Sequence, residues 1–219
     1  MTYPVTERTR LRRLPQRGAY DTATVHAILD EGLVCHLGFV DEGRPVTIPT
    51  AYARVGESLV VHGSSKSRTM LALARGAEVC CTVTLADALV LARSAFHHSI
   101  NYRSVVVFGR AVALEDAAEK EAALRHFVER LYPGRWDAVR PPTPAELKAT
   151  AVLAIPLCEA SAKVRTGPPI DDEPDYALAV WAGVVALSTR RTGVTPDERL
   201  HPAIDPAAVP ATALFPEAT

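Results

Sequence analysis

Residues 33–63 read LVCHLGFVDEGRPVTIPTAYARVGESLVVHG, and this stretch decides the fold class. It contains three apolar runs, at 33–40, 45–54 and 58–63, which are separated by the short connections DEGR and VGE. Runs of this length with turn residues between them are typical of antiparallel hairpins. We therefore predict three consecutive strands joined by tight turns.

Helices are predicted on both sides of these strands. Upstream, Asp21 is placed to cap a helix that runs to about Glu31 and stops at Gly32. Downstream, the next helix is predicted from about Ser67 to Arg75. Each of the two helices thus begins at a side chain that can accept a hydrogen bond from the first turn.

The remaining elements continue the alternation of strands and helices. They are strands at 78–95 and 104–114, a helix that begins at Asp116, a short helix with a capping box at Thr143, and either a strand pair or one long bent strand at 149–165. The apolar run 176–187 is ambiguous between a helix and a strand. Strands joined by tight turns, with helices inserted between them, predict a mainly β protein built as an antiparallel barrel.

The length of the chain allows one well-buried domain. With 219 residues, the chain is marginal for two domains. We expect a loose N-terminal arm at 1–20 and one domain at 21–190. Residues 191–219, in which proline and alanine dominate, are expected to form a weakly ordered C-terminal tail.

The composition excludes several classes of protein. Hydrophobic residues make up 48% and charged residues 22% of the chain, which is ordinary for a globular protein. The net charge of -1 argues against a general nucleic-acid binder. No apolar run is long enough to span a membrane, and the polar N-terminus lacks the apolar segment of a secretory signal, so we expect a cytoplasmic protein.

A cluster of hydroxyls and cations lies where the third strand gives way to a helix. The stretch VVHGSSKSRTMLALARG (60–76) contains Ser64, Ser65, Lys66, Ser67 and Arg68. A phosphate group binds cations, hydroxyl donors and the free N–H groups of a helix start, all of which this stretch supplies. Serine is also an ordinary helix cap, so the stretch is either a common helix start or a phosphate site. A Walker-type P-loop is absent.

A second polar cluster lies between two apolar strands, in the stretch ARSAFHHSINYRSVVVFG (92–109). It includes the adjacent histidines His97 and His98. A metal site usually needs three or four converging ligands, and neither H-E-x-x-H nor a paired Cys–His spacing occurs, so no metal is expected. The cluster is either a structural turn or a ligand pocket.

Five motifs occur in a fixed order along the chain. They are RPVTIPTAY (44–52), HGSSKSR (62–68), LVLARSAFHHSINYRSVVVFG (89–109), SAKVRTGPP (161–169) and WAGV (181–184). In this order and spacing they resemble the pyridoxamine 5'-phosphate oxidase-like flavoproteins, and within them the flavin-nucleotide-binding proteins related to nitroimidazole-resistance proteins. The resemblance covers about residues 15–190. It implies an FMN-binding split barrel, usually a homodimer with two flavins at the subunit interface.

The resemblance also implies which residues contact the flavin. The implied contacts are Ile48, Pro49 and Thr50 along the flavin ring, His62 and Gly63 beside it, Ser64, Lys66, Ser67 and Arg68 at the phosphate, Asn101, Tyr102, Arg103 and Ser104 from the partner subunit, and Trp181 as a late aromatic that closes the site. Donors near the pyrimidine edge stabilise the negative charge of a reduced flavin, and Arg103 or His62 would serve that end.

The implied function is that of an FMN-dependent oxidoreductase that reduces a small organic compound, such as a nitro-aromatic or a quinone, by hydride transfer through flavin N5. His62 or His98 is the candidate proton donor, because the reference pKa of histidine lies near neutrality. Two alternatives stay open: a protein that stores or senses flavin without turnover, and a barrel of the same type that uses deazaflavin or haem. Vitamin B6 oxidation is not expected, because Arg199 and His201 lie in a proline-rich tail without the usual surroundings of the substrate-binding pair.

Overall fold

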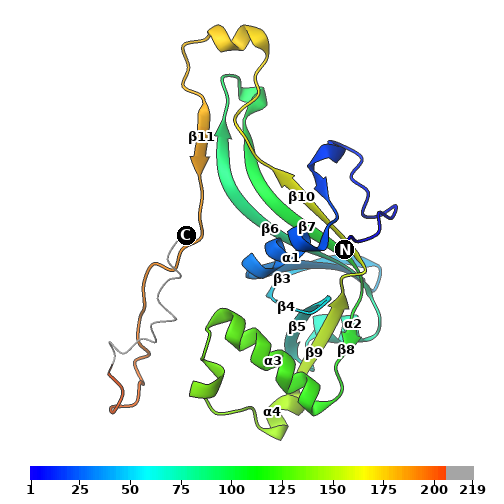
Figure 1. Cartoon of the computed structure of the whole chain (residues 1–219). Helices are drawn as coiled ribbons and strands as arrows, with labels where there is room; N and C mark the ends of the chain where they lie inside the picture. Colours follow the sequence, from blue (N-terminus) through cyan, green and yellow to red (C-terminus); the bar gives the residue numbers. More distant parts are fainter. Residues whose placement is uncertain (206–219) are drawn as a thin grey trace.

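The computed structural model describes residues 1–205, which form two antiparallel sheets with helices packed around them (Figure 1). The strands of the larger sheet are β1 (Gly18–Ala19), β2 (Val34–Asp41), β3 (Arg44–Ala51), β6 (Glu78–Leu91), β7 (Ser99–Arg110), β10 (Glu159–Arg165) and β11 (Gly183–Ala186). Their order is β1-β10-β7-β6-β2-β3, and β11 pairs with β6. The prediction of a mainly β fold with inserted helices, in an antiparallel split-barrel arrangement, is confirmed.

The smaller sheet is formed by four strands of the described residues. They are β4 (Ala53–Val55), β5 (Ser58–Ser64), β8 (Val112–Ala113) and β9 (Thr150–Pro156), in the order β4-β5-β9-β8. The second strand predicted within residues 33–63 is interrupted at Tyr52, where the chain passes from the larger sheet to the smaller one. Tyr52 is fully buried, and its hydroxyl donates to the carbonyl oxygen of Leu29 at 2.6 Å. One predicted strand therefore serves both sheets.

Local capping signals account for where the helices begin. The α-helices of the described residues are α1 (Thr22–Glu31), α2 (Arg68–Ala74), α3 (Ala117–Leu131) and α4 (Pro144–Ala149). The carboxylate of Asp21 accepts from the backbone N–H of Thr24 at 2.8 Å, and Asp116 caps α3 in the same way. Thr143 and Glu146 form the predicted capping box of α4. None of these helices is both long and apolar enough to cross a membrane.

The main core is a cluster of apolar side chains from both sheets, α1 and α2. Its large, buried members include Ile28, Leu37, Leu73 and Ile155. A smaller cluster, formed by Val60, Ala123 and Val152, joins β5 and β9 to α3. Because side chains alternate along β5, Leu59 and Val61 face the main core while Val60 faces α3. The strand is covered on both faces, which explains its continuous apolar run.

Arg130 of α3 ties this helix to α1. Its guanidinium donates to the carbonyl oxygens of Tyr52 at 2.7 Å, Leu29 at 3.0 Å and Asp30 at 3.1 Å, and to that of Gly32. Carbonyls at the C-terminal end of a helix have no partner within the helix. One arginine therefore satisfies the end of α1 and fixes the position of α3.

Replacing Arg130 with methionine is expected to lower the free energy of unfolding by about 2–4 kcal/mol, because buried carbonyls lose charge-assisted hydrogen bonds. Chemical denaturation followed by circular dichroism measures this loss. The control is Arg125→Met on the same helix, where an exposed side chain forms an ion pair with Asp137 at 2.9 Å. Its effect is expected to stay within about 0.5 kcal/mol. Equal losses in the two variants would contradict the role of Arg130.

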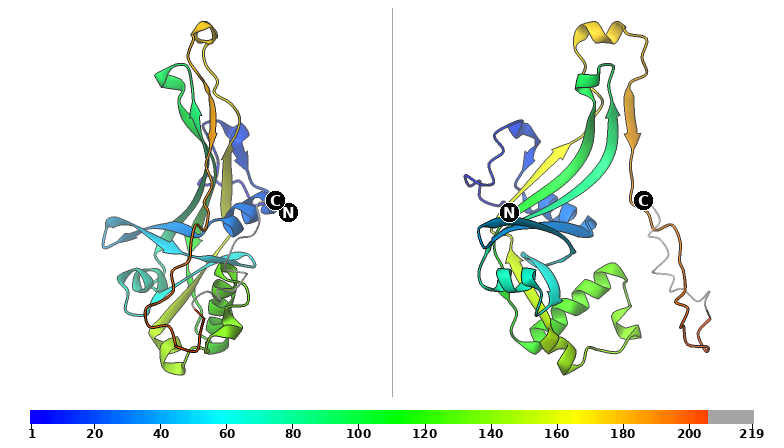
Figure 2. Two further views of the ribbon diagram at one scale, coloured as in Figure 1. Left: turned by 90° about the vertical axis from the view of Figure 1, so that its left-hand side faces the viewer. Right: turned by 180° about the vertical axis from the view of Figure 1, so that it is seen from behind.

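A long hairpin of β6 and β7 extends beyond the body of the molecule (Figures 1 and 2). A bulge between Ala86 and Ala88 bends it, and its outer half pairs with β11. At the tip, the buried carboxylate of Asp171 accepts from the backbone N–H of Arg93 at 3.0 Å and from the Arg93 guanidinium at 3.1 Å. The segment after β10 is therefore fastened to the tip of the hairpin.

The structure also resolves or corrects three predicted boundaries. The strand predicted at 104–114 begins at Ser99, so the stretch 101–104 belongs to β7 and not to a turn. Residues 149–165 form two strands, β9 and β10, which belong to different sheets. The ambiguous run 176–187 contains the end of a 3₁₀ helix (Glu173–Ala177) and β11. Each of these outcomes depends on a pairing partner that is distant in the sequence.

Two residues of the N-terminal segment 1–20, Tyr3 and Thr9, are buried, although this segment was expected to form a loose arm. Tyr3 is buried, and its hydroxyl bonds to Glu57 at 2.7 Å and to His26 at 2.8 Å. At the other end, residues 191–205 are exposed and contain no helix or strand. Residues 206–219 of the predicted tail lie outside the described residues.

Candidate functional site

The loop between β5 and α2, residues 65–67, is the predicted phosphate site and, with Ser64 and Arg68 on either side, is named the phosphate loop for that prediction. It is a tight turn, in which the backbone N–H of Ser67 donates to the carbonyl oxygen of Ser64 at 2.8 Å. Ser67 occupies the N-cap position of α2, but its hydroxyl makes no capping hydrogen bond. The side chain of Lys66 is exposed and has no partner among the described residues. The loop thus presents a hydroxyl and an ammonium group that are available to an anion.

Arg68, the other cation of this loop, is bound to Asp41 at the end of β2. Its Nε lies 2.5 Å from one carboxylate oxygen, and Arg75 approaches the other oxygen at 3.6 Å. The hydrogen bond to Asp41 raises the pKa of Arg68. An anion at this loop would therefore compete with Asp41 for the guanidinium of Arg68.

The residues predicted to lie along the flavin ring are on β3, at one edge of the larger sheet. β3 pairs with β2 among the described strands, and Ile48 on it is 37% exposed. Pro45 and Pro49 have no N–H group to donate, which an edge strand tolerates. The hydroxyl of Thr50 donates to the carbonyl oxygen of Ala51 at 3.4 Å. The strand offers partly apolar surface close in sequence to the phosphate loop.

His62 and Gly63 face opposite sides of β5. A Cβ added to Gly63 would lie 3.3 Å from the side chain of Met70, so Gly63 allows α2 to pack closely. The ring of His62 packs edge to face on Phe127 of α3, with 4.5 Å between centroids. Burial lowers the pKa of His62, and its Nδ1 is buried without a hydrogen-bond partner within residues 1–205. His62 therefore belongs to the α3 face of the smaller sheet, whereas Gly63 faces α2.

The second predicted group, residues 101–104, lies on β7 and away from β3. β6 and β2 separate β7 from β3 in the sheet order. Three strand spacings amount to about 14 Å. Within one chain, these residues and β3 therefore do not meet. The separation agrees with the assignment of residues 101–104 to the site of a partner subunit, which stays a prediction.

Arg103 is held by two carboxylates that the sequence interpretation missed. Its guanidinium donates to Asp87 at 2.8 and 3.0 Å and to Glu31 at 2.5 and 2.8 Å. These hydrogen bonds raise the pKa of Arg103. Arg103 can contact a flavin only if it gives up part of this network. Glu31 is 72 residues away along the chain, so no local pattern could have indicated it.

Other predicted site residues are spread along the hairpin and the start of β11. The hydroxyl of Ser104 donates to the carbonyl oxygen of Lys163 at 3.4 Å. His98 is exposed at the hairpin tip, where its Nδ1 lies 2.9 Å from the carbonyl oxygen of Ser94. Trp181, just before β11, is 66% exposed. His62 and His98, the two candidate proton donors, therefore do not share a site within one chain.

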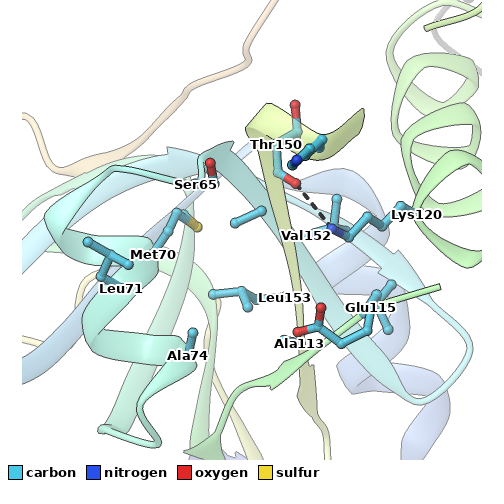
Figure 3. Close-up of a pocket in the computed structure, with 13 residues that line it drawn as sticks. Ser65, Met70, Leu71, Ala74, Ala113, Glu115, Lys120, Thr150, Val152 and Leu153 are labelled. Carbon is cyan, nitrogen blue, oxygen red and sulfur yellow. Dashed lines mark hydrogen bonds between the residues drawn. The ribbon is translucent and has the colours of Figure 1, made fainter. Parts of the chain in front are cut away.

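A cavity of about 260 Å³ opens beside the phosphate loop, between α2 and the start of α3 (Figure 3). Met70 and Leu153 form part of its apolar wall, and Ser65 lies at its rim. Lys120 reaches across from α3, with its ammonium group 3.5 Å from the carbonyl oxygen of Thr150. Lys148 also lines the cavity, as does Glu115. The cavity combines apolar walls with positive charge, which suits an apolar molecule that carries an acidic group.

A protein-family model described as pyridoxamine 5'-phosphate oxidase matches residues 21–164, from the start of α1 through most of β10. The chain belongs to this family. The recognition of the family from its five motifs is thereby confirmed. The matched region includes the phosphate loop, His62 and the hairpin, whereas Trp181 and β11 lie beyond it.

Two solved structures are similar to this family member over nearly its whole length. Flavocytochrome Anf3 from Azotobacter vinelandii is 42% identical, with 95% of each chain covered and a TM-score of 0.89. The FAD and haem binding protein from Mycobacterium smegmatis is 32% identical, with 90% of this chain and 95% of that chain covered and a TM-score of 0.84. No curated protein sequence matches the chain.

A third solved structure is similar in fold at a lower sequence identity. A structure described as a 5-nitroimidazole antibiotic resistance protein from Bacteroides thetaiotaomicron is 19% identical, with 78% of this chain and 90% of that chain covered and a TM-score of 0.58. At this identity the likeness shows a common fold alone.

Proposed function

We propose that this chain binds a flavin nucleotide together with haem and acts as an oxidoreductase. The observation that carries the proposal is the 42% identity, over 95% of both chains, with a flavocytochrome. A protein that binds FAD and haem is similar over 90% of this chain and supports the same pair of cofactors. The sequence motifs imply a flavin as the cofactor, with haem as an alternative to it. The proposal combines the two cofactors in one protein.

The phosphate loop and β3 fit a flavin nucleotide. The hydroxyl of Ser67 makes no capping bond, and Lys66 has no partner among the described residues. These two residues, with Arg68, would hold the phosphate, and Ile48 would lie against the ring. The motifs imply FMN as the nucleotide, whereas the similarity to an FAD-binding protein favours the dinucleotide.

The α3 face of β5 fits a haem. Histidine commonly binds haem iron, and the buried Nδ1 of His62 has no partner among the described residues. Phe127 packs on the imidazole, and Val152, which lines the cavity, lies opposite His62 on β9. Lys120 and Lys148 at this cavity would pair with the haem carboxylates. His62, which is not among the lining residues of this cavity but lies next to Val152 of its wall, would hold the iron, and the two lysines would hold the acidic groups.

The state of His62 suits a ligand better than a proton donor. A bound flavin supplies hydride and one-electron transfer, and a bound haem supplies one-electron transfer. Burial lowers the pKa of His62, so its imidazole is neutral near pH 7 and has a lone pair for coordination.

For the electron acceptor we retain a small organic compound of the nitro-aromatic or quinone type. His98, which is exposed at the hairpin tip, remains the candidate proton donor.

The hairpin supports a homodimer. Val185, Leu89 and Ile100 lie side by side on β11, β6 and β7, and each side chain is more than a third exposed. Such an apolar row on a protruding hairpin is typical of a surface that another protein covers. A second copy of this chain would cover it and would bring residues 101–104 of one subunit toward β3 of the other.

The absorption spectrum of the purified chain, as isolated and after addition of flavin and hemin, tests the proposal. We expect flavin bands and a haem Soret band together, and chromatography of the released cofactor separates FMN from FAD. A preparation that takes up neither cofactor would overturn the proposal, and one that binds flavin alone would overturn its haem half. Anaerobic reduction by NADH or NADPH, followed by reoxidation with a nitro compound or a quinone, separates an enzyme from a storage or sensor protein.

A further inference from the structure

Arg165, at the end of β10, is a buried cation without a carboxylate partner. Only 8% of the residue is exposed. Its guanidinium donates one hydrogen bond to the side-chain oxygen of Asn101, whose amide nitrogen in turn donates to the carbonyl oxygen of Gly167 at 3.0 Å. No ion pair of Arg165 is formed within residues 1–205. The other N–H groups of this guanidinium make no hydrogen bond within residues 1–205, and they are accessible to solvent.

Two further cations lie next to Arg165. Side chains alternate along a strand, so Lys163 projects from the same face of β10 as Arg165. Lys163 is also paired in register with Gly18, and Arg17 immediately precedes this glycine in a short turn that packs on β10. Neither Arg17 nor Lys163 has a side-chain partner among the described residues. Three positive charges are therefore gathered around one strand end.

No carboxylate balances this group within the described residues. The acidic residue on the same face of β10 is Glu159, four residues before Lys163, and it is bound by Arg8. Burial and the nearby charge of Arg17 lower the pKa of Arg165. Arg103 on the neighbouring strand shows the opposite arrangement, because two carboxylates surround it. A buried cation without an opposite charge is costly to the fold, which points to a ligand that supplies the charge.

We propose that Arg17, Lys163 and Arg165 form a binding site for a phosphate or diphosphate group. A single carboxylate would balance one of the three charges, whereas a phosphoryl ligand balances two or more. The planar guanidinium matches the geometry of phosphate oxygens, and Asn101 fixes the orientation of the Arg165 guanidinium. Tyr102, opposite Arg165 in register, adds a hydroxyl on the same face. This site lies on β10 of the larger sheet and is separate from the loop after β5, a strand of the smaller sheet. Its three cations are not among the residues proposed to contact the flavin or the haem.

Isothermal titration of the full chain with inorganic pyrophosphate tests the site. We expect the wild type to bind pyrophosphate and to gain thermal stability from it. Arg165→Gln keeps an N–H donor for Asn101 but removes the charge, and it is expected to weaken pyrophosphate binding by at least about tenfold. Lys163→Gln and Arg17→Gln, at the less buried positions, are expected to weaken it by smaller factors. Arg13→Gln, which removes an exposed charge from the same N-terminal segment, is the matched control and is expected to bind as the wild type does.

Competition identifies the source of the phosphoryl group. If the site holds the diphosphate of a dinucleotide, FAD displaces pyrophosphate and riboflavin does not. If it holds free phosphate, inorganic phosphate displaces pyrophosphate and FAD binds independently.

Two results would overturn the site: a wild type that takes up no pyrophosphate at millimolar concentration, and an Arg165→Gln variant that binds it as tightly as the wild type. If the wild type takes up none and Arg165→Gln elutes as a smaller species than the wild type, the guanidinium is assigned to a carboxylate of a second subunit. Thermal unfolding without ligand shows whether each variant is folded.

Discussion

Replacing His62 with alanine is expected to abolish the haem Soret band while the flavin bands remain. His62 lies on the α3 face of β5, where its buried Nδ1 has no partner among the described residues, and the flavin contacts are proposed on β3 and on the loop after β5. Loss of residues that merely support a metal ligand costs about 10–100-fold in affinity, so loss of the ligand itself should cost more than about 100-fold. Titration with hemin, followed at the Soret band, measures this loss.

The matched control for this experiment is His126→Ala. His126 precedes Phe127 on α3 but is exposed, so its removal is expected to leave haem binding unchanged. Added imidazole is expected to restore part of the Soret band in His62→Ala, because it can occupy the space of the lost side chain. Unchanged hemin affinity in His62→Ala, in a variant that keeps its thermal stability, would mean that another residue holds the iron.

The second large effect is expected when the cations of the phosphate loop are removed. The double variant Lys66→Ala and Arg68→Ala should lower the affinity for FMN or FAD by about 100-fold, because two charge-assisted contacts to phosphate are lost. The affinity for riboflavin, which carries no phosphate, should not change. Fluorescence titration of the apoprotein with the three flavins measures the difference. An equal loss for riboflavin would show that the loop supports the fold and not the phosphate.

Asp41→Asn examines the same site in the opposite direction. Asp41 holds Arg68 at 2.5 Å and Arg75 at 3.6 Å, so neutralising this carboxylate frees a guanidinium for the phosphate. The affinity for FMN is expected to rise roughly twofold to fivefold, which corresponds to the energy of a weak ion pair. Only the Arg68 side of this pair is exposed, and Asp41 is buried. A matched change of an unrelated ion pair, Asp137→Asn, should have no effect on flavin binding. A fall in FMN affinity in Asp41→Asn would assign Asp41 to the flavin site.

Local chemistry in the sequence was sufficient to predict where most elements begin and end. Asp21 and Thr143 each accept a hydrogen bond from the first turn of their helix, as predicted, because a cap acts within four residues. The strands of residues 33–63 followed from apolar runs between turns. The family followed from five short motifs.

The sequence could not predict how strands are assigned to sheets. Residues 149–165 read equally well as one strand or two, and pairing places β9 with β5 in one sheet and β10 with β7 in the other. The start of β7 was placed five residues late, because its first residues are polar and gain strand geometry from pairing with β6. β-Strand formation depends on partners that are far away in the chain, so a local pattern carries little of this information.

The serines and cations of residues 64–68, the histidine before them and the family motifs around them could be read directly from the sequence. Which arginines of the chain are paired with a carboxylate became clear from the fold alone. Arg68 meets Asp41, Arg103 meets Glu31, and Arg165 meets no carboxylate within residues 1–205. The physical reason is that an ion pair acts over a few ångströms in space, whereas the partners are 27 and 72 residues apart in the chain.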